Sequence, residues 1–223
     1  MWPDYSVIIP VFNGASTIAE TIQSVVAQTV PPKEIIVVDD GSSDGTGEIA
    51  SAASPLVRVV RQENAGCGAA TNRGMDEVSC AVLAMVDADD LFTPEKMETQ
   101  LRHLAANPDC HGVFCHMRTF RTDGVEAGSN KLTPGWSRST IVIHSAAARK
   151  VGPVIDPPGS RGDMIDWIGR AKEIGLRFDM LDEVMLLRRV HPGSMSYGRD
   201  DNKDRGYLHV AWLAMQRRKA QGQ

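Results

Sequence analysis

The feature that most constrains this chain is the alternation of short apolar runs with helix-like segments in its first half. Runs of β-forming residues predict four strands, at residues 6–10, 34–38, 56–60 and 81–86. Between the first two runs, apolar residues from Ile18 to Val26 recur at helical spacing. This alternation predicts an α/β fold with a mainly parallel sheet and helices on both faces. Right-handed crossovers would then bring the carboxyl ends of the strands to one edge of the sheet.

Local signals predict where several of the helices begin. Thr17 and Glu20 fit a capping box at the start of the first helix. Thr93 followed by Pro94 is typical of a helix start, since proline is tolerated at the first helical position. Another helix is expected from about residue 68 to residue 78.

The second half of the chain has a less regular pattern. Strands are predicted at residues 113–121, 139–144 and 184–189. A helix is predicted from about 163 to 174, closed by Gly175, and a further helix is predicted near the C-terminus. A chain of 223 residues is long enough for a single domain with a sizeable core. We expect residues 1–106 to form one half of it and residues 107–223 the other.

Polar side chains follow three of the predicted strands. They are the segments Pro10-Val11-Phe12-Asn13, Asp39-Asp40-Gly41 and Asp87-Ala88-Asp89. Ligands of open α/β sheets bind at the carboxyl edge, so these segments are expected to share one cleft. Two carboxylates two residues apart can both reach a hard cation such as Mg²⁺ or Mn²⁺. Asp residues also favour turns, so a solvated loop is the alternative for the short Asp-x-Asp segment.

Four segments in order carry a resemblance to a known family. They are residues 7–13, 37–46, 64–74 and 86–90. Together they resemble the nucleotide-binding half of a family 2 glycosyltransferase with the Rossmann-like GT-A fold, and the resemblance covers about residues 6–105. It implies a nucleotide-diphosphate sugar donor, commonly a UDP-sugar, a Mn²⁺ or Mg²⁺ cofactor and inverting transfer to an acceptor hydroxyl. The residues from 107 onward then form an acceptor-side extension.

The resemblance also implies roles for residues of the first half. Asp40 matches the residue that contacts the base, and Asp39 lies beside it. The segment that lines the nucleoside pocket is matched by Pro10, Phe12 and Asn13. The metal motif is matched by Asp87 and Asp89, with Asp89 closest to the cation, Asp87 nearer the ribose and Ala88 between them in the donor site.

His191 and Arg73 are placed by the resemblance or by a departure from it. His191 follows a late strand, as does a family histidine that completes the metal site, and imidazole suits Mn²⁺ better than Mg²⁺. Family members often carry Arg where this chain has Thr71, so Arg73 is considered as a substitute donor contact. The catalytic base of the family is the Asp of a Glu-Asp pair that opens a helix.

That Glu-Asp pair is altered in this chain. Gly162-Asp163 or Asp163-Met164 stands in its place, so Asp163 is the first candidate for the base and Asp166 the second. A carboxylate is needed because an acceptor hydroxyl is a poor nucleophile until a base removes its proton. Asp163 could instead only stabilise the helix dipole, by about 0.3–1 kcal/mol.

Three other functions each fit part of the sequence. The altered Glu-Asp pair suggests a degenerate glycosyltransferase that binds nucleotide without transferring sugar. A nucleotidyltransferase would need a basic Gly-rich loop after the first strand, and residues 11–16 contain no Arg or Lys. An NAD-dependent oxidoreductase is suggested by Gly66-Cys67-Gly68, but Thr71 stands where the third small residue of that fingerprint belongs.

Composition limits the partners. The net charge of −4 gives no reason to expect a nucleic acid. Four cysteines without paired spacing are typical of reduced thiols in a cytoplasmic protein. No apolar run reaches the roughly 20 residues of a membrane span. The acceptor is expected to be a saccharide, a glycolipid or a peptide, and a lipid-linked acceptor would need peripheral docking, for which the basic residues 217–219 are a candidate.

Overall fold

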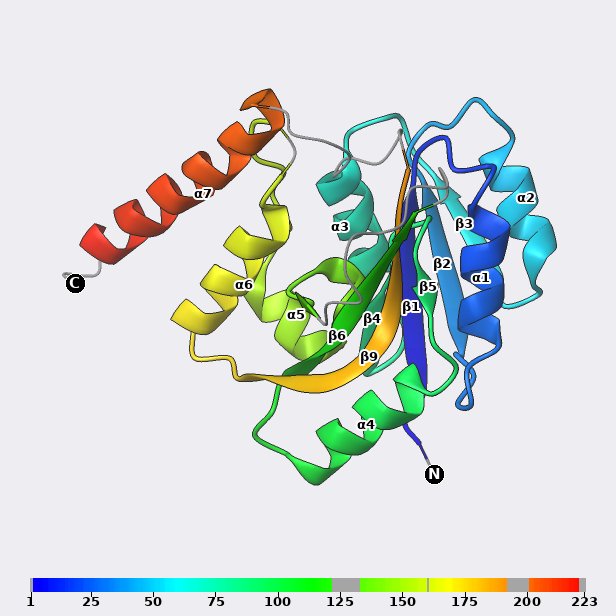
Figure 1. The fold of residues 1–223 in the computed structure, drawn as a ribbon, viewed down its shortest axis with the longest axis horizontal. Coiled ribbons are helices and arrows are strands. Elements are labelled where there is room, and N and C mark those ends of the chain that lie inside the picture. Colours follow the sequence, from blue (N-terminus) through cyan, green and yellow to red (C-terminus); the bar gives the residue numbers. More distant parts are fainter. Residues whose placement is uncertain (1, 122–132, 160, 192–200, 221–223) are drawn as a thin grey trace.

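The computed structural model of this chain describes residues 2–121, 133–159, 161–191 and 201–220. A central sheet lies between two layers of helices (Figure 1). The strands are β1 (Tyr5–Val11), β2 (Glu34–Asp39), β3 (Val57–Arg61), β4 (Val82–Met85), β5 (Leu91–Phe92), β6 (Gly112–Arg121), β7 (Thr133–Pro134), β8 (Val142–His144) and β9 (Phe178–Val190). The helices are α1 (Ile18–Val26), α2 (Thr46–Ala53), α3 (Cys67–Glu77), α4 (Lys96–Ala106), α5 (Ser145–Val151), α6 (Asp163–Glu173) and α7 (Asp201–Ala220), with a 3₁₀ turn at Arg138–Thr140.

The strand order is β3-β2-β1-β4-β8-β6-β9-β5, with β7 paired to β6. β1 runs parallel to β2 and to β4, and β2 runs parallel to β3. β8 is antiparallel to both β4 and β6, and β6 is parallel to β9. Strands β4, β6 and β9 therefore point the same way, and the prediction of a mainly parallel α/β sheet is confirmed.

The sheet is buried on both faces because its central strands are apolar along most of their length. Val7 and Ile9 pack into one core with α1, α2 and α4. Ile8, between them, packs into the other core with α3, α5 and α6. Successive side chains of a strand point to opposite faces, so a continuous apolar run fills both cores. Trp167 of α6 is fully buried in the second core.

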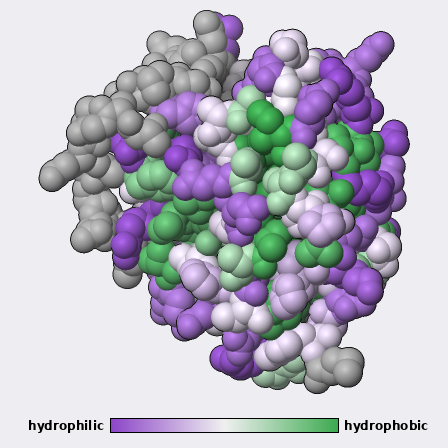
Figure 2. All heavy atoms as spheres, turned by 90° about the vertical axis from the view of Figure 1, so that its right-hand side faces the viewer, coloured by the Kyte–Doolittle hydropathy of each residue, from purple (hydrophilic) through white to green (hydrophobic). Residues whose placement is uncertain are grey.

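Surface composition changes over short distances on the α1 and α2 side of the molecule. Hydrophobic and hydrophilic surface alternate there (Figure 2). This mixture is ordinary for a face in water, since more than half of a folded protein's surface is apolar.

Three local predictions were wrong. Thr17 precedes α1 but makes no capping bond with its side chain. Glu20 forms an ion pair with Arg189 instead of capping α1, a contact between segments far apart in the sequence. α4 begins at Lys96 rather than at Pro94, and only the second part of the strand predicted at 139–144 forms one, because Arg138–Thr140 is a 3₁₀ turn.

The C-terminal helix α7 packs beside α6 and then extends away from the sheet (Figure 1). Its start is close to the loop before α6, since a Cβ at Gly206 would clash with the carbonyl oxygen of Arg161. Among the described helices, none is both long enough and apolar enough to cross a bilayer.

Candidate functional site

The two carboxylates after β2 are buried and hold the neighbouring loops. Asp39 Oδ1 accepts the N–H of Ser42 at 2.8 Å, which closes the turn after the strand. Asp40 accepts the N–H groups of Ala65 and Gly66, each at 2.9 Å, and a side-chain amide of the same loop. Asp40 therefore positions the loop before α3. A carboxylate has about four acceptor sites, so capacity for one more donor is left.

The loop after β1 is fastened to the loop after β2. Asn13 adopts a left-handed backbone conformation with φ of 51°. Its N–H donates to Ser42 Oγ at 2.9 Å, and its Oδ1 accepts the N–H of Ser43 at 3.0 Å. Phe12 is 54% exposed beside it, whereas Pro10 is buried within β1. The structure thus brings Asn13 and Asp39 to one edge and leaves the Phe12 ring accessible there.

The loop after β4 meets the end of β9. His191 Nε2 lies 3.3 Å from Asp89 Oδ2. Arg189 fixes this approach, since its N–H donates to Asp90 Oδ1 at 3.0 Å and its Nε donates to the carbonyl oxygen of Asp89 at 2.8 Å. Burial raises the pKa of Asp89, as does the neighbouring Asp87, while His191 opposes the shift. Asp89 and His191, which the sequence resemblance associates, therefore do face each other.

A buried guanidinium connects this loop to the start of α6. Arg138 is 4% exposed, and its Nη1 donates to Asp87 Oδ1 at 3.1 Å while its Nη2 pairs with Asp163. Nη1 also lies 2.6 Å from the sulfur of Cys67. Burial raises the pKa of Asp163, and Arg138 opposes that rise. We refer to Asp87, Arg138 and Asp163 as the Arg138 cluster.

Asp156 adds a third carboxylate next to this cluster. Its Oδ2 accepts the N–H of Gly68 at 2.8 Å, at the start of α3. A Cβ at Gly66 or Gly68 would lie less than 3 Å from the same carboxylate, so only glycine leaves room for it. Gly66 and Gly68, which resemble part of a dinucleotide fingerprint in the sequence, therefore leave the space that the Asp156 carboxylate occupies.

Two predicted site residues are engaged elsewhere. Asp166 is 3% exposed and accepts Arg170 Nε and Arg217 Nη1, each at 2.8 Å. It therefore holds α7 against α6. Arg73 forms an ion pair with Glu77 at 2.9 Å along the exposed side of α3. Neither of these contacts involves the Arg138 cluster.

Sequence reasoning missed Arg138 and Asp156. Arg138 stands in a short Ser-rich stretch that was predicted to lead into a strand, and no local pattern marks it. Its partner Asp87 lies 51 residues away in the sequence. Asp156 precedes two prolines in the segment between α5 and α6, and its position against Gly68 depends on how that segment folds back on α3.

The sheet order, the acidic loops after β2 and β4 and the acid that opens α6 define a GT-A glycosyltransferase fold. The model is similar to TarS residues 1–349 of S. aureus in complex with UDP-GlcNAc, with a TM-score of 0.75 and 21% identity over 93% of this chain and 65% of that one. It is also similar to the mannosyltransferase PcManGT of Pyrobaculum calidifontis in complex with GDP-Man and Mn²⁺. That match has a TM-score of 0.78 and 18% identity over 97% of this chain and 65% of the other.

The family model for glycosyl transferase family 2 matches residues 6–154, and the chain belongs to this family. It is 37% identical over 166 residues to the uncharacterized glycosyltransferase YibD of Escherichia coli K12, covering 65% of this chain and 48% of that protein. It is 42% identical over 102 residues to an uncharacterized glycosyltransferase of Rickettsia typhi, covering 46% of this chain and 32% of that protein. The chain thus spans less than half the length of either relative.

Proposed function

We propose that this chain is the donor-binding and catalytic part of a metal-dependent, inverting glycosyltransferase that uses a nucleotide-diphosphate sugar, preferably a UDP-sugar. One observation carries the proposal: Asp89 faces His191, and on the same loop Asp87 is joined through Arg138 to Asp163. The complexes of TarS with UDP-GlcNAc and of PcManGT with GDP-Man support a nucleotide-sugar donor. In this proposal residues 1–106 bind the donor and residues 107–223 receive a saccharide, glycolipid or peptide acceptor.

The residues at the loop after β4 fit a divalent cation. Asp89 Oδ2 and His191 Nε2 are 3.3 Å apart, and adjacent ligands about 2.1 Å from an octahedral ion lie about 3 Å from each other. Asp87 offers a further oxygen from the same loop. Carboxylate and imidazole ligands together suit Mn²⁺. When bound, the ion would stabilise the negative charge that develops on the departing diphosphate.

Asp163 is the proposed base. Its carboxylate opens α6, and burial raises its pKa toward the range in which a carboxylate removes protons effectively. Arg138 binds one of its oxygens and fixes the orientation of the carboxylate. The other oxygen would accept the proton of the acceptor hydroxyl. Asp166 is a weaker candidate because both of its oxygens accept arginine N–H groups.

The contact between Arg138 and Asp163 also supports a second candidate function, nucleotide binding without transfer. A guanidinium stabilises the ionised carboxylate and thereby weakens it as a base. Membership of glycosyl transferase family 2 argues against the nucleotidyltransferase and the NAD-dependent oxidoreductase.

Donor hydrolysis distinguishes the two candidates. We expect Mn²⁺-dependent release of the nucleoside diphosphate from at least one donor in a panel of UDP-GlcNAc, UDP-glucose and GDP-mannose, with a UDP-sugar preferred. Asp163→Asn is expected to lower this release by about 100-fold or more. UDP affinity, measured by calorimetry, should change little in the variant. Tight UDP binding without release from any donor would favour the non-transferring protein, and full activity of Asp163→Asn would exclude Asp163 as the base.

A further inference from the structure

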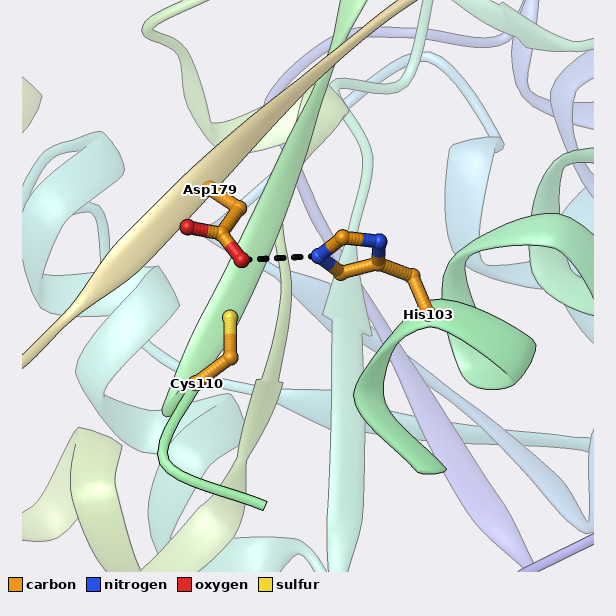
Figure 3. Close-up of side chains that lie close together, drawn as sticks. All are labelled: His103, Cys110 and Asp179. Atoms are coloured by element: carbon orange, nitrogen blue, oxygen red, sulfur yellow. Dashed lines mark hydrogen bonds and ion pairs between the residues drawn. The ribbon is translucent and has the colours of Figure 1, made fainter. Parts of the chain in front are cut away.

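Three side chains with metal-binding atoms meet at the end of the sheet opposite the Arg138 cluster. His103 lies in the last turn of α4, Cys110 lies in the loop before β6, and Asp179 is the second residue of β9 (Figure 3). Their ligand atoms all lie within 4.8 Å of one another. We refer to these residues as the His103 site.

The topology separates the His103 site from the donor site. β4, β6 and β9 point the same way, so β6 and β9 begin at the edge opposite to the one where β4 ends. Cys110 comes just before β6, whereas Asp87 comes just after β4. An ion bound at the His103 site would therefore be separate from an ion bound at the Asp89 loop.

The three residues are held by contacts of their own backbone and side chains. His103 Nε2 lies 2.8 Å from Asp179 Oδ2, and the dashed line in Figure 3 marks this contact. Cys110 is 2% exposed, and its thiol lies 3.1 Å from the carbonyl oxygen of Gly112. The Cys110 N–H donates to the carbonyl oxygen of Asn107, which fixes the turn between α4 and β6. The cysteine thus points at the imidazole and carboxylate from a fixed turn.

We propose that His103, Cys110 and Asp179 bind a Zn²⁺ ion through Nε2, Sγ and a carboxylate oxygen. In tetrahedral zinc sites, bonds of about 2.0–2.3 Å place the ligand atoms roughly 3.3–3.7 Å apart. The atoms of the His103 site already lie within 4.8 Å, so side-chain adjustment is enough to form it. Three protein ligands leave a fourth position for water.

Ligand chemistry selects zinc at this site. A thiolate and an imidazole are soft or borderline ligands that favour Zn²⁺, whereas Mg²⁺ and Mn²⁺ prefer oxygen. Binding of the ion would displace the thiol proton of Cys110 to solvent, and the resulting thiolate and the Asp179 carboxylate would together balance the two positive charges of the ion. The His103 site and the Asp89 loop are therefore expected to differ in metal preference.

The bound ion would connect the turn between α4 and β6 to a strand that is distant in the sequence. It would tie the end of α4 and the start of β6 to the start of β9, the strand that leads to Arg189 and His191. A metal that binds the folded but not the unfolded chain raises the thermal midpoint. The ion is thus expected to stabilise the fold rather than take part in transfer.

Cobalt provides a direct test, because Co²⁺ bound to a thiolate gives a charge-transfer absorption in the near ultraviolet. We expect metal-free protein to bind one equivalent of Co²⁺ with this absorption, and Zn²⁺ to displace it and raise the thermal midpoint. Cys110→Ser should abolish the absorption. His103→Gln, a change at a partly exposed helix position, should weaken Zn²⁺ binding by more than about tenfold.

Matched controls keep the test specific. Cys80→Ser changes another buried cysteine and should leave the absorption intact, and Asp89→Asn should leave it intact as well. The proposal is overturned if wild-type protein shows no thiolate absorption with Co²⁺, or if the absorption survives both Cys110→Ser and His103→Gln. Neither result would bear on the donor site, which contains no cysteine ligand.

Discussion

At the scale of single residues, Arg138 is the side chain that makes the site possible. Asp87 and Asp163 would repel each other in a partly buried setting without a cation between them. The sequence allowed the carboxylates to be predicted because each follows a strand or opens a helix. It did not allow Arg138 to be predicted, because its role depends on contacts 51 and 25 residues away in the chain.

Replacing Arg138 should therefore destabilise the protein. We expect Arg138→Met to lower the free energy of unfolding by about 3 kcal/mol, because a buried pair loses one partner. Asp87→Asn in the same background should restore part of that loss. Urea denaturation of the two single variants and the double variant measures the coupling. Strict additivity would show that Arg138 and Asp87 do not interact.

Lys96 is a second buried cation, and its environment predicts a pH dependence. It is fully buried, its Nζ lies 4.4 Å from the centre of the Phe92 ring, and burial lowers its pKa to about 8 from 10.5. The folded state therefore disfavours the charged amine. This penalty is complete below pH 8, decreases as the pH rises from 8 to 10.5, and is absent above pH 10.5.

Lys96→Met removes this titration while keeping the size of the side chain. Between pH 7 and pH 10, the free energy of unfolding of wild type should rise by roughly 2 kcal/mol relative to that of Lys96→Met, because the buried amine of wild type loses its charge. Other titrating groups cancel in the difference, and Lys150→Met, at an exposed position of α5, provides the control. A difference that is constant with pH would contradict the account.

At the scale of elements, local patterns predicted the helices and strands of the first half better than their ends. The apolar periodicity of α1 and α6 was sufficient to predict both helices, because each packs one face against the sheet. The predicted capping box does not form because Thr17 Oγ1 donates to the carbonyl oxygen of Gly14 and Glu20 pairs with Arg189. The strand prediction at 139–144 was wrong for residues 139 and 140, which belong to a buried 3₁₀ turn that no local pattern distinguishes from a strand.

Asp166 gives a test at this scale, since its Oδ1 accepts Arg217 of α7 while its Oδ2 accepts Arg170 of α6 itself. Asp166→Asn should lower the free energy of unfolding by about 3 kcal/mol, because two arginines lose a buried carboxylate. Donor hydrolysis by the remaining folded protein should stay close to wild type. Asp182→Asn, at a position whose side chain is 96% exposed, is the stability control. Loss of hydrolysis with unchanged stability would instead make Asp166 the base.

At the scale of the whole molecule, the parallel order of β3, β2, β1 and β4 collects the polar loops at one edge. That part of the site could be predicted, because right-handed crossovers leave few possible arrangements of the strands in the sheet. The second half could not be placed in the same way. β8 enters antiparallel between β4 and β6, and the contacts of Arg138, Asp156 and His191 depend on that order.

The central claim is that carboxylates from separate strands hold one divalent cation together with the diphosphate of the donor. Calorimetry of UDP binding with and without Mn²⁺, on wild type and on Asp89→Asn, tests it most directly. We predict that Mn²⁺ raises the UDP affinity of wild type by at least about tenfold, or 1.4 kcal/mol, and that Asp89→Asn loses this gain. An affinity for UDP that does not respond to Mn²⁺, or a gain that survives in Asp89→Asn, would contradict the account.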